Sequence, residues 1–438
     1  MGRISKCLLI VLAMCLLLSS AGCTGKPEQT PEIPNVTTPE TPPPDDAADE
    51  KVEEPAEAPE PEPEITPLVK IAEPVAKRLD TGVLITLDGT DIISKTTETG
   101  YKLSSSIHSS ETLTVESEVP FAALYIKWDD LPGVFSLEWD GGSMNCGAED
   151  FLHDYIRLPR SVNSVSFVFE DDSTQSIKEI GVYTYGTAPY GVQDWLLPCE
   201  TANILVFPTH ADDDTLFFGS VISYYAIEKG LTVQTAFMTA HYSEPYRDHE
   251  RLDGLWEMGV RHYPILGTEP DYYASTLYEA ASYHGYDPIY EWQVELIRRF
   301  KPLVILGHDL NGEYGHGQHR LNAHCLVDAV DMAADAEQYP ESAEQYGIWD
   351  TPKLYLHLYE ENSIVFDVNV VLNNDPEGRT PFEIAQDAYK CHVSQQQYYF
   401  AVTQDPDSVL NCIEYGLYRT LVGYDTGADL MEHTARGE

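Results

Sequence analysis

The sequence predicts an α/β fold, a Rossmann-like and mostly parallel sheet with helices on both faces, preceded by an all-β jelly-roll sandwich. From residue 195 onward, short apolar runs alternate with helix-like segments that end at glycine, which is typical of parallel sheets covered by helices. Residues 68–190 instead carry short runs of alternating polarity separated by Gly, Pro, Asp and Ser, which is typical of antiparallel sandwiches. We therefore expect two folded domains, at 68–190 and 195–438.

The N-terminal segment 1–23 has the pattern of a secretory signal peptide. Arg3 and Lys6 precede an apolar run over 8–18 that is too short to span a bilayer as an ordinary helix. The Ser-Ala-Gly-Cys sequence that follows resembles the lipobox of bacterial lipoproteins, which would make Cys23 a lipidated mature N-terminus. A plain signal peptide cleaved near Ala21 is the alternative. We expect export and anchoring at the outer face of the bacterial cell membrane, with no membrane contact other than the lipid.

The segment 24–67 is dense in Pro and Glu and has almost no large apolar residues. Because it cannot bury a core, we expect it to stay disordered and extended. At roughly 3 Å per residue where it is polyproline-like, it could hold the rest of the chain on the order of 100 Å from the membrane. We interpret it as a linker.

The charge balance excludes two classes of partner. The 438 residues include 26 Lys and Arg against 72 Asp and Glu, for a formal net charge of −46. No basic stripe is available to neutralise phosphates, so we expect neither nucleic acid nor anionic lipid surfaces to bind.

Two features bear on the role of the β-sandwich. Its closing run, Ile177 to Tyr183, resembles the last strand of discoidin-like jelly rolls. Tyr125, Trp128 and Trp139 could stack on sugars, as in a carbohydrate-binding accessory domain. Aromatic residues on strands are, however, more often part of the core, and the sequence leaves both interpretations open.

The domain over 195–438 contains apolar strands and helices in alternation. The helix over 214–229 ends at Gly230 and the helix over 248–258 ends at Gly259, as is common at helix C-termini. In such sheets, ligands bind at the carboxyl ends of the strands. The expected strands are 203–207, 232–238, 303–306 and 354–358, and the remaining helices are 288–300 and 317–336.

Two polar loops directly follow apolar strands. The first is His-Ala-Asp-Asp-Asp at 210–214, and the second, over 308–319, contains His316 and His319 on one face of a helix turn. Since two parallel strand ends can face each other across one crevice, one His and one Asp from the first loop and one His from the second would make a three-ligand site. Three N and O ligands with an open fourth position describe catalytic zinc, whereas structural sites are closed and usually rich in Cys. The alternative is a pair of solvated polar loops.

At these motifs the sequence resembles the LmbE/PIG-L family of zinc-dependent de-N-acetylases. The family's HPDDE motif corresponds to HADDD at 210–214, and its YGHxxH segment corresponds to YGHGQH at 314–319. Between the two motifs the family has an Arg, a Glu three residues later and a Leu-Gly-Val-like triplet. The same order is found here in Arg247, Glu250 and the Met-Gly-Val run at 258–260.

The resemblance extends from about Ala202 to near Tyr424. It implies that one zinc ion is bound by His210, Asp213 and His319. It also implies that Asp212 is the general base of an amide hydrolysis.

Further roles follow from the same resemblance. His316 would steady the oxyanion or protonate the leaving amine, and Tyr314 would assist at the oxyanion. Arg247 and Asp271 would hold hydroxyl groups of the sugar. Six further histidines of the domain are expected to be surface or structural residues: His241, His249, His262, His284, His324 and His357.

Three residues depart from the family pattern. Ala211 replaces Pro and Asp214 replaces Glu, which are mild changes beside the ligands. Gln318 stands where many relatives have Asp. Without that acid, His316 would be less readily protonated, unless Glu313 or Asp309 takes over its role. The departures affect the acid–base assignment and not the metal.

The predicted function is zinc-dependent hydrolysis of the N-acyl group, in the first place N-acetyl, of amino sugars at the cell surface, with release of acetate. The partner would be an N-acetylated sugar or glycan. Two alternatives stay open. One is a surface glycan-binding lipoprotein with an inactive deacetylase-like domain, and the other is a zinc amidase acting on another amide, such as a thiol conjugate.

Overall fold

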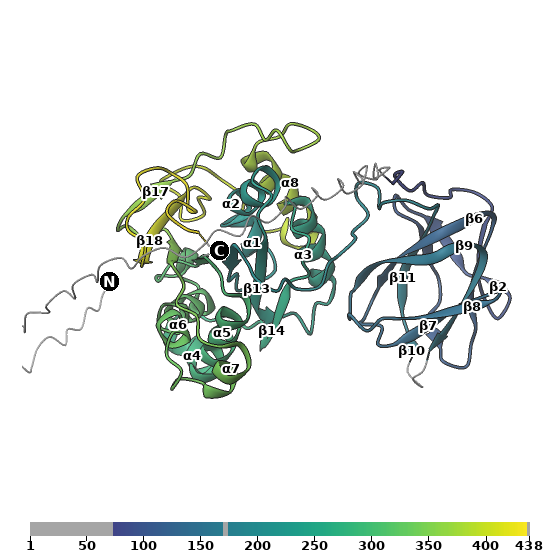
Figure 1. Ribbon diagram of the computed structural model, residues 1–438, viewed down its shortest axis with the longest axis horizontal. Helices are drawn as coiled ribbons and strands as arrows, with labels where there is room; N and C mark the ends of the chain where they lie inside the picture. Colours follow the sequence, from purple (N-terminus) through teal and green to yellow (C-terminus); the bar gives the residue numbers. More distant parts are fainter. Residues whose placement is uncertain (1–72, 170–173, 436–438) are drawn as a thin grey trace, which may run out of the picture. The chain divides into compact units, whose positions relative to one another are not determined.

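The computed structural model describes residues 73–169 and 174–435. The signal peptide, Cys23 and the linker over 24–67 lie outside the described residues. The described chain has a mixed α/β fold with large sheets (Figure 1). An all-β part is followed along the chain by an α/β part, and no described helix combines the length and apolar character needed to cross a membrane.

Within the described residues, the all-β part has a nine-stranded antiparallel sheet and a separate two-stranded one. Its longest strands, β6 (Leu113–Trp128) and β9 (His153–Phe169), pair with each other, and their register shifts near Phe121, as at the β-bulges that let long strands bend. The other strands are β1 (Val83–Leu87), β2 (Thr90–Asp91), β3 (Ile93–Thr96), β4 (Tyr101–Leu103), β5 (Ile107–His108), β7 (Phe135–Trp139), β8 (Gly142–Cys146), β10 (Thr174–Gln175) and β11 (Ile177–Tyr183).

Two of the aromatic residues considered for sugar stacking belong to the core. Tyr125 and Trp128 are fully buried, and the Trp128 ring meets the Phe135 ring edge-on with centroids 5.1 Å apart. Trp139 is half-buried and packs against the same core. A sugar-binding face built on Tyr125 and Trp128 is therefore wrong, because neither ring reaches solvent.

The α/β part contains a seven-stranded sheet in the order β14-β13-β12-β15-β16-β18-β17, counted over the described chain. The strands from β14 to β16 run parallel, and β18 runs antiparallel to both of its neighbours, β16 and β17, so the expected mostly parallel sheet is present. The strands are β12 (Ile204–Val206), β13 (Val233–Ala240), β14 (Ile265–Pro270), β15 (Val304–Gly307), β16 (Lys353–His357), β17 (Ser363–Val365) and β18 (Glu414–Thr420).

Helices cover both faces of this sheet, with α2, α3 and α8 on one side and α4 to α7 on the other (Figure 1). In β12, Ile204 and Val206 join the apolar cluster that includes α2, α3 and α8, whereas Leu205 joins the cluster that includes α5 and α6. The helices are α1 (Asp213–Leu216), α2 (Gly219–Ser223), α3 (Tyr246–Glu257), α4 (Leu277–His284), α5 (Asp287–Phe300), α6 (Gly317–Ala333), α7 (Pro340–Tyr346) and α8 (Pro381–Cys391), with short turns at η1 (Tyr224–Glu228), η2 (Glu313–Gly315) and η3 (Val393–Gln395).

The helix predicted over 214–229 is instead broken into α1, α2 and the π-helical turn η1. Both residues at the break are buried, with Phe217 against the His357 ring at 5.3 Å and Phe218 against the His308 ring at 5.4 Å. Consecutive side chains of a regular helix point about 100° apart, so a straight helix would not direct both rings to this region. The prediction of one continuous helix is wrong for this reason.

One side chain fixes α6 against the end of β12. Asn322 donates to the carbonyl of Phe207 at 3.1 Å and to the hydroxyl of Thr209 at 2.9 Å. Its own amide oxygen accepts a hydrogen bond from Gln293 of α5 at 2.7 Å. Since α6 carries His319 and the segment after β12 carries His210, this contact holds the two predicted ligand loops in place.

We expect Asn322→Leu to lower the free energy of unfolding by about 1–3 kcal/mol, because buried groups of Phe207, Thr209 and Gln293 would lose their partner. Urea unfolding followed by circular dichroism measures the effect. The matched control is Asn311→Leu at an exposed asparagine, which should change stability by less than about 0.5 kcal/mol. Equal stabilities of the two variants would contradict the role given to Asn322.

Candidate metal site

The two polar loops lie at the point in the sheet where the strand order reverses direction. β12 and β15 are hydrogen-bonded neighbours, and the chain passes from β12 to β13 and β14 on one side before it returns to β15 on the other. Loops that follow such a pair of strands diverge and leave a crevice. The N–H of Thr209 donates to Nε2 of His308 at 2.9 Å, which joins the two loops at their base.

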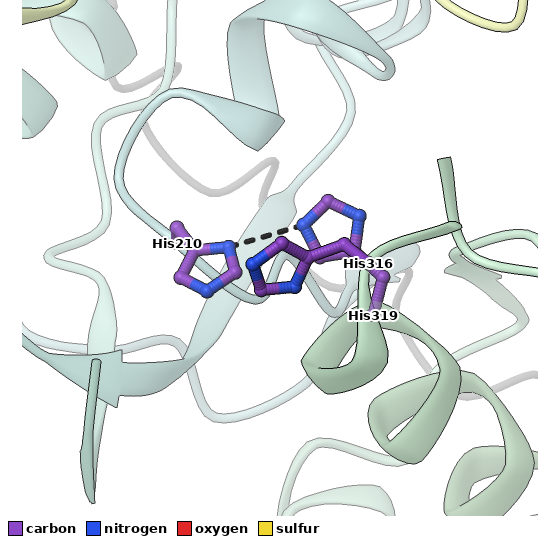
Figure 2. Close-up of side chains that lie close together, drawn as sticks. All are labelled: His210, His316 and His319. Carbon is purple, nitrogen blue, oxygen red and sulfur yellow. Dashed lines mark hydrogen bonds between the residues drawn. The ribbon is translucent and has the colours of Figure 1, made fainter. Parts of the chain in front are cut away.

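Three predicted ligand atoms converge in this crevice, all from buried side chains. Nδ1 of His210 lies 3.0 Å from Nε2 of His319 and 3.2 Å from Oδ2 of Asp213, and those last two atoms are 3.3 Å apart. A tetrahedral zinc ion with bonds of about 2.0–2.1 Å keeps its ligand atoms roughly 3.3–3.4 Å apart. The three atoms therefore stand close to the spacing that zinc requires. Figure 2 shows His210 facing the histidines of the other loop, with the contact to His319 dashed.

Hydrogen bonds decide which nitrogen each histidine offers. Nδ1 of His319 donates to the Glu313 carboxylate at 2.8 Å, which leaves the lone pair on Nε2. Nε2 of His210 donates to Oε1 of Gln318 at 2.9 Å, which leaves the lone pair on Nδ1. These free nitrogens are the two that lie 3.0 Å apart, so the tautomers suit metal binding.

Gln318 is itself held in one orientation. Its amide nitrogen donates to the carbonyl of Pro270 at 3.1 Å and to Nε2 of His284 at 2.8 Å. Nδ1 of His284 in turn donates to Glu269 at 2.6 Å. Since a carbonyl can only accept, the NH₂ group of Gln318 must face Pro270, and its oxygen must face His210.

Glu313 is a fully buried carboxylate that orients three histidines. His308, His319 and His357 each bring Nδ1 to within 2.8 Å of it. Nε2 of His308 is used by Thr209, and Nε2 of His357 donates to a backbone carbonyl at 2.6 Å, so neither ring has a lone pair left for a metal.

The sequence predicted no role for His308 and a surface or structural position for His357. His357 is structural and lies directly under the site. The pattern that could have identified both was their position: each stands at or directly after the carboxyl end of a parallel strand, β15 and β16.

The electrostatics of the site favour a bound cation. Burial opposes ionisation of Asp213, but His319 and His210 lower the pKa of this carboxyl well below its usual value. Burial opposes protonation of His319, but Asp213 and Glu313 raise the pKa of its imidazole to about 10. Without a metal, a second proton on Nε2 of His319 supplies the positive charge that the two carboxylates require, and a divalent cation bound at Nε2 would replace that proton.

Asp212 lies beside this trio in a strained conformation. Its backbone φ is 133°, which residues with a side chain rarely adopt, and it caps α1. Its carboxylate lies 3.2 Å from Arg247. Burial, and then the charge of Asp213, raise the pKa of Asp212 to about 7. A carboxyl group with that pKa can accept a proton near neutral pH, as a general base must.

Arg247 connects the trio to Asp271. One guanidinium nitrogen donates to Asp271 at 3.0 Å, and the other donates to the carbonyl of Ala211 at 2.6 Å. Asp271 also lies 3.2 Å from Nδ1 of His241 and 3.5 Å from Nε2 of His210. Arg247 is buried and engaged by protein groups, whereas the Asp271 side chain is 26% exposed and can reach a ligand.

A cavity opens beside Asp271. Its volume is about 200 Å³, and its lining includes His241, Tyr242, Glu244 and Tyr272. Typical ligand pockets measure about 300–1,000 Å³, so this cavity suits one small group of a substrate.

Tyr314 is 37% exposed and lies at the solvent side of the site, next to the buried His316. Nδ1 of His316 accepts the N–H of Gln318 at 3.3 Å, and burial together with His210 lowers the pKa of His316 to about 2. A neutral His316 offers Nε2–H as a donor, which suits the oxyanion role more than the protonation of an amine. The Tyr314 ring centroid is 5.8 Å from that of His316 and 5.5 Å from that of His319.

The structure thus brings together every predicted site residue of the α/β part. Their roles as ligands, base and substrate contacts stay predictions. The residues that complete the arrangement, and for which the sequence predicted no part in a site, are His241, Glu269, His284, His308 and His357.

No family model matches this sequence. Over 194 residues the chain is 28% identical to the 1D-myo-inositol 2-acetamido-2-deoxy-alpha-D-glucopyranoside deacetylase of Rhodococcus erythropolis, an alignment that covers 38% of this chain and 65% of the relative. The second deacetylase of this name from Saccharopolyspora erythraea is 38% identical over 69 residues, which cover 16% of this chain and 24% of the relative. The homologues of this chain are deacetylases.

The expected kinship with deacetylases is thereby confirmed, although the chain spans less than two thirds of the length of these two relatives. Among solved structures, N,N'-diacetylchitobiose deacetylase from Pyrococcus horikoshii aligns with a TM-score of 0.35 at 16% identity. That alignment covers 44% of this chain and 71% of the other.

We expect Gln318→Leu to weaken zinc binding by about 10- to 100-fold, because His210 would lose the acceptor that fixes its tautomer. Competition with a chromophoric chelator measures the affinity. Nitrogen-15 chemical shifts of the imidazoles should show His210 as the Nε2–H form in the wild-type protein and as a mixture in the variant.

The matched control is Gln234→Leu. Gln234 is equally buried and its amide bonds only backbone groups, but it lies near the amino end of β13, away from the crevice. This variant should lose stability and keep its zinc affinity. Unchanged zinc affinity in Gln318→Leu would refute the orienting role of Gln318.

Proposed function

We propose that this chain is a zinc-dependent N-deacetylase that removes the acetyl group from N-acetylated amino sugars. The observation that carries the proposal is the buried triangle of His210, Asp213 and His319, with ligand atoms 3.0–3.3 Å apart and both imidazoles in a metal-binding tautomer. The names of the homologous deacetylases, which act on a 2-acetamido-2-deoxy sugar, support the substrate class.

Zinc held by the three ligands would supply Lewis-acid chemistry, which activates water and polarises the amide carbonyl. Asp212 takes the proton from the attacking water, and Arg247 holds its carboxylate in place. His316 donates Nε2–H to the developing oxyanion, where one such donor is typically worth about 3–4 kcal/mol of barrier. As the C–N bond breaks, the proton on Asp212 passes to the leaving amine, and acetate and a free amino sugar result.

The cavity beside Asp271 supports binding of one sugar ring next to these groups. Asp271 accepts hydrogen bonds from sugar hydroxyls, and the hydrogen bond from Arg247 holds its carboxylate in position. The amine product is a cation, and the carboxylates around the site favour it over the neutral amide.

We further propose that the deacetylase domain at 195–438 is exported and lipid-anchored through Cys23, with a spacer at 24–67. The support is the pattern of the N-terminal sequence. Residues 68–190 would form a discoidin-like jelly roll, a proposal supported by the antiparallel nine-stranded sheet within the described part of this range.

We expect the purified chain to contain one zinc ion and to release acetate from N-acetylglucosamine oligomers. His319→Ala should lose both properties, because it removes a ligand. Asp212→Asn should keep zinc and lower kcat by about 10²- to 10⁴-fold, because an amide cannot accept the proton. Metal analysis and an enzyme-coupled acetate assay measure the two properties.

The three outcomes separate the candidate functions. Zinc binding without acetate release would confirm the metal site but not the substrate, and other amides would then be tested. A chain that binds no zinc would favour an inactive, glycan-binding scaffold. Full activity of Asp212→Asn would show that another group is the base.

A further inference from the structure

Exposed aromatic side chains gather beside the metal site. Tyr273 is 74% exposed and Tyr399 is 77% exposed, while Tyr314 is 37% exposed. They come from three segments far apart in the sequence: the loop after β14, the turn before α6 and the segment after α8. Contiguous aromatic surface at a protein's exterior commonly marks a binding site.

The rings form one continuous series, which we call the aromatic strip: Tyr273, His316, Tyr314, Phe400 and Tyr399. Successive centroids are 5.2, 5.8, 5.0 and 4.6 Å apart. His316, which is buried and faces the proposed metal ligands, therefore lies beneath the middle of the strip and not at its end. A molecule bound along the strip would have its reacting unit at His316 and further units over the other rings.

The strip is too long for a single sugar. A pyranose ring is about as wide as one phenol ring, so one amino sugar seated at the metal site would leave Phe400 and Tyr399 uncovered. The cavity beside Asp271 is also too small for more than one ring. Additional sugar units would have to lie on the strip.

The composition of the strip favours a neutral glycan. It consists of aromatic rings with no aliphatic member, and its two most exposed residues, Tyr273 and Tyr399, each combine a flat apolar face with a hydroxyl group. Sugars present the same combination, with apolar C–H faces and hydroxyl edges. The formal net charge of −46 disfavours acidic polymers, since like charges repel.

We propose that the aromatic strip is an extended glycan-binding site, and that the substrate is a chain of neutral N-acetylated amino sugars and not a free monosaccharide. This inference rests on the proposed deacetylase function. Tyr273 and Tyr399 are the specificity-determining residues, each stacking on a sugar unit next to the one that loses its acetyl group.

The test compares acetate release from N-acetylglucosamine with release from its oligomers, from the dimer to the hexamer. For the wild-type chain we expect kcat/KM to rise by about 2- to 10-fold for each ring of the strip that gains a sugar, through a lower KM. Tyr399→Ala should lower the hexamer-to-monomer ratio of kcat/KM by about 2- to 10-fold, and Tyr273→Ala should do the same.

The matched control is Tyr278→Ala. Tyr278 is 85% exposed on α4 and, within the described residues, contacts no ring of the strip. This variant should keep the wild-type ratio. Equal kcat/KM for the monomer and the hexamer in the wild-type chain would overturn the strip as a glycan site while leaving the deacetylase function in place.

Glycan binding is measured separately, so that a failure of the deacetylase proposal can be told apart from a failure of the glycan-site proposal. Isothermal titration of the wild-type chain and both strip variants with the hexamer is independent of turnover. Hexamer binding that weakens in Tyr399→Ala but not in Tyr278→Ala would support the strip even without acetate release. No hexamer binding by the wild-type chain would overturn it.

Discussion

The pairing of β12 with β15 is the constraint on which the proposed metal site depends. Ile204 lies opposite Val304 in this pair, and the register continues to Val206 and Leu306. A slip of one residue would move one loop by about 3.3 Å relative to the other. That shift equals the whole spacing between the ligand atoms, which are 3.0–3.3 Å apart, so the site exists in one register only.

The buried charges explain why so many polar side chains surround three ligands. Burying a carboxylate without partners is strongly unfavourable, and Glu313 avoids this by accepting hydrogen bonds from three histidines and from the backbone N–H of Asp309. The same bonds prevent those rings from rotating. The hydrogen bonds that stabilise the buried carboxylate of Glu313 therefore also fix the orientation of His319.

The two ligand loops could be predicted because each follows an apolar strand directly, and a parallel sheet places such strand ends at one edge. The helix break at Phe217 and Phe218 could not be predicted, because it depends on contacts with the rings of distant residues that only the fold brings near. Helix α8 was missed although its signal was present: Thr380 and Glu383 form a capping box around Pro381. The contact of Gln318 with His284 could not be predicted from the sequence, since the position of His284 depends on helix α4, which was not predicted.

Gln318 shows how a departure from a family pattern can be compensated locally. An Asp at this position would place a carboxylate against the Pro270 carbonyl, which has no proton to give, and would leave that carbonyl without its donor. Glutamine satisfies both sides, because it accepts from His210 and donates to Pro270. The negative charge that an Asp would have supplied is provided by Asp271, 3.5 Å from the same His210 nitrogen. The substitution therefore removes an acid from beside His316 while keeping His210 oriented, and this supports the proposal that Asp212 carries the proton.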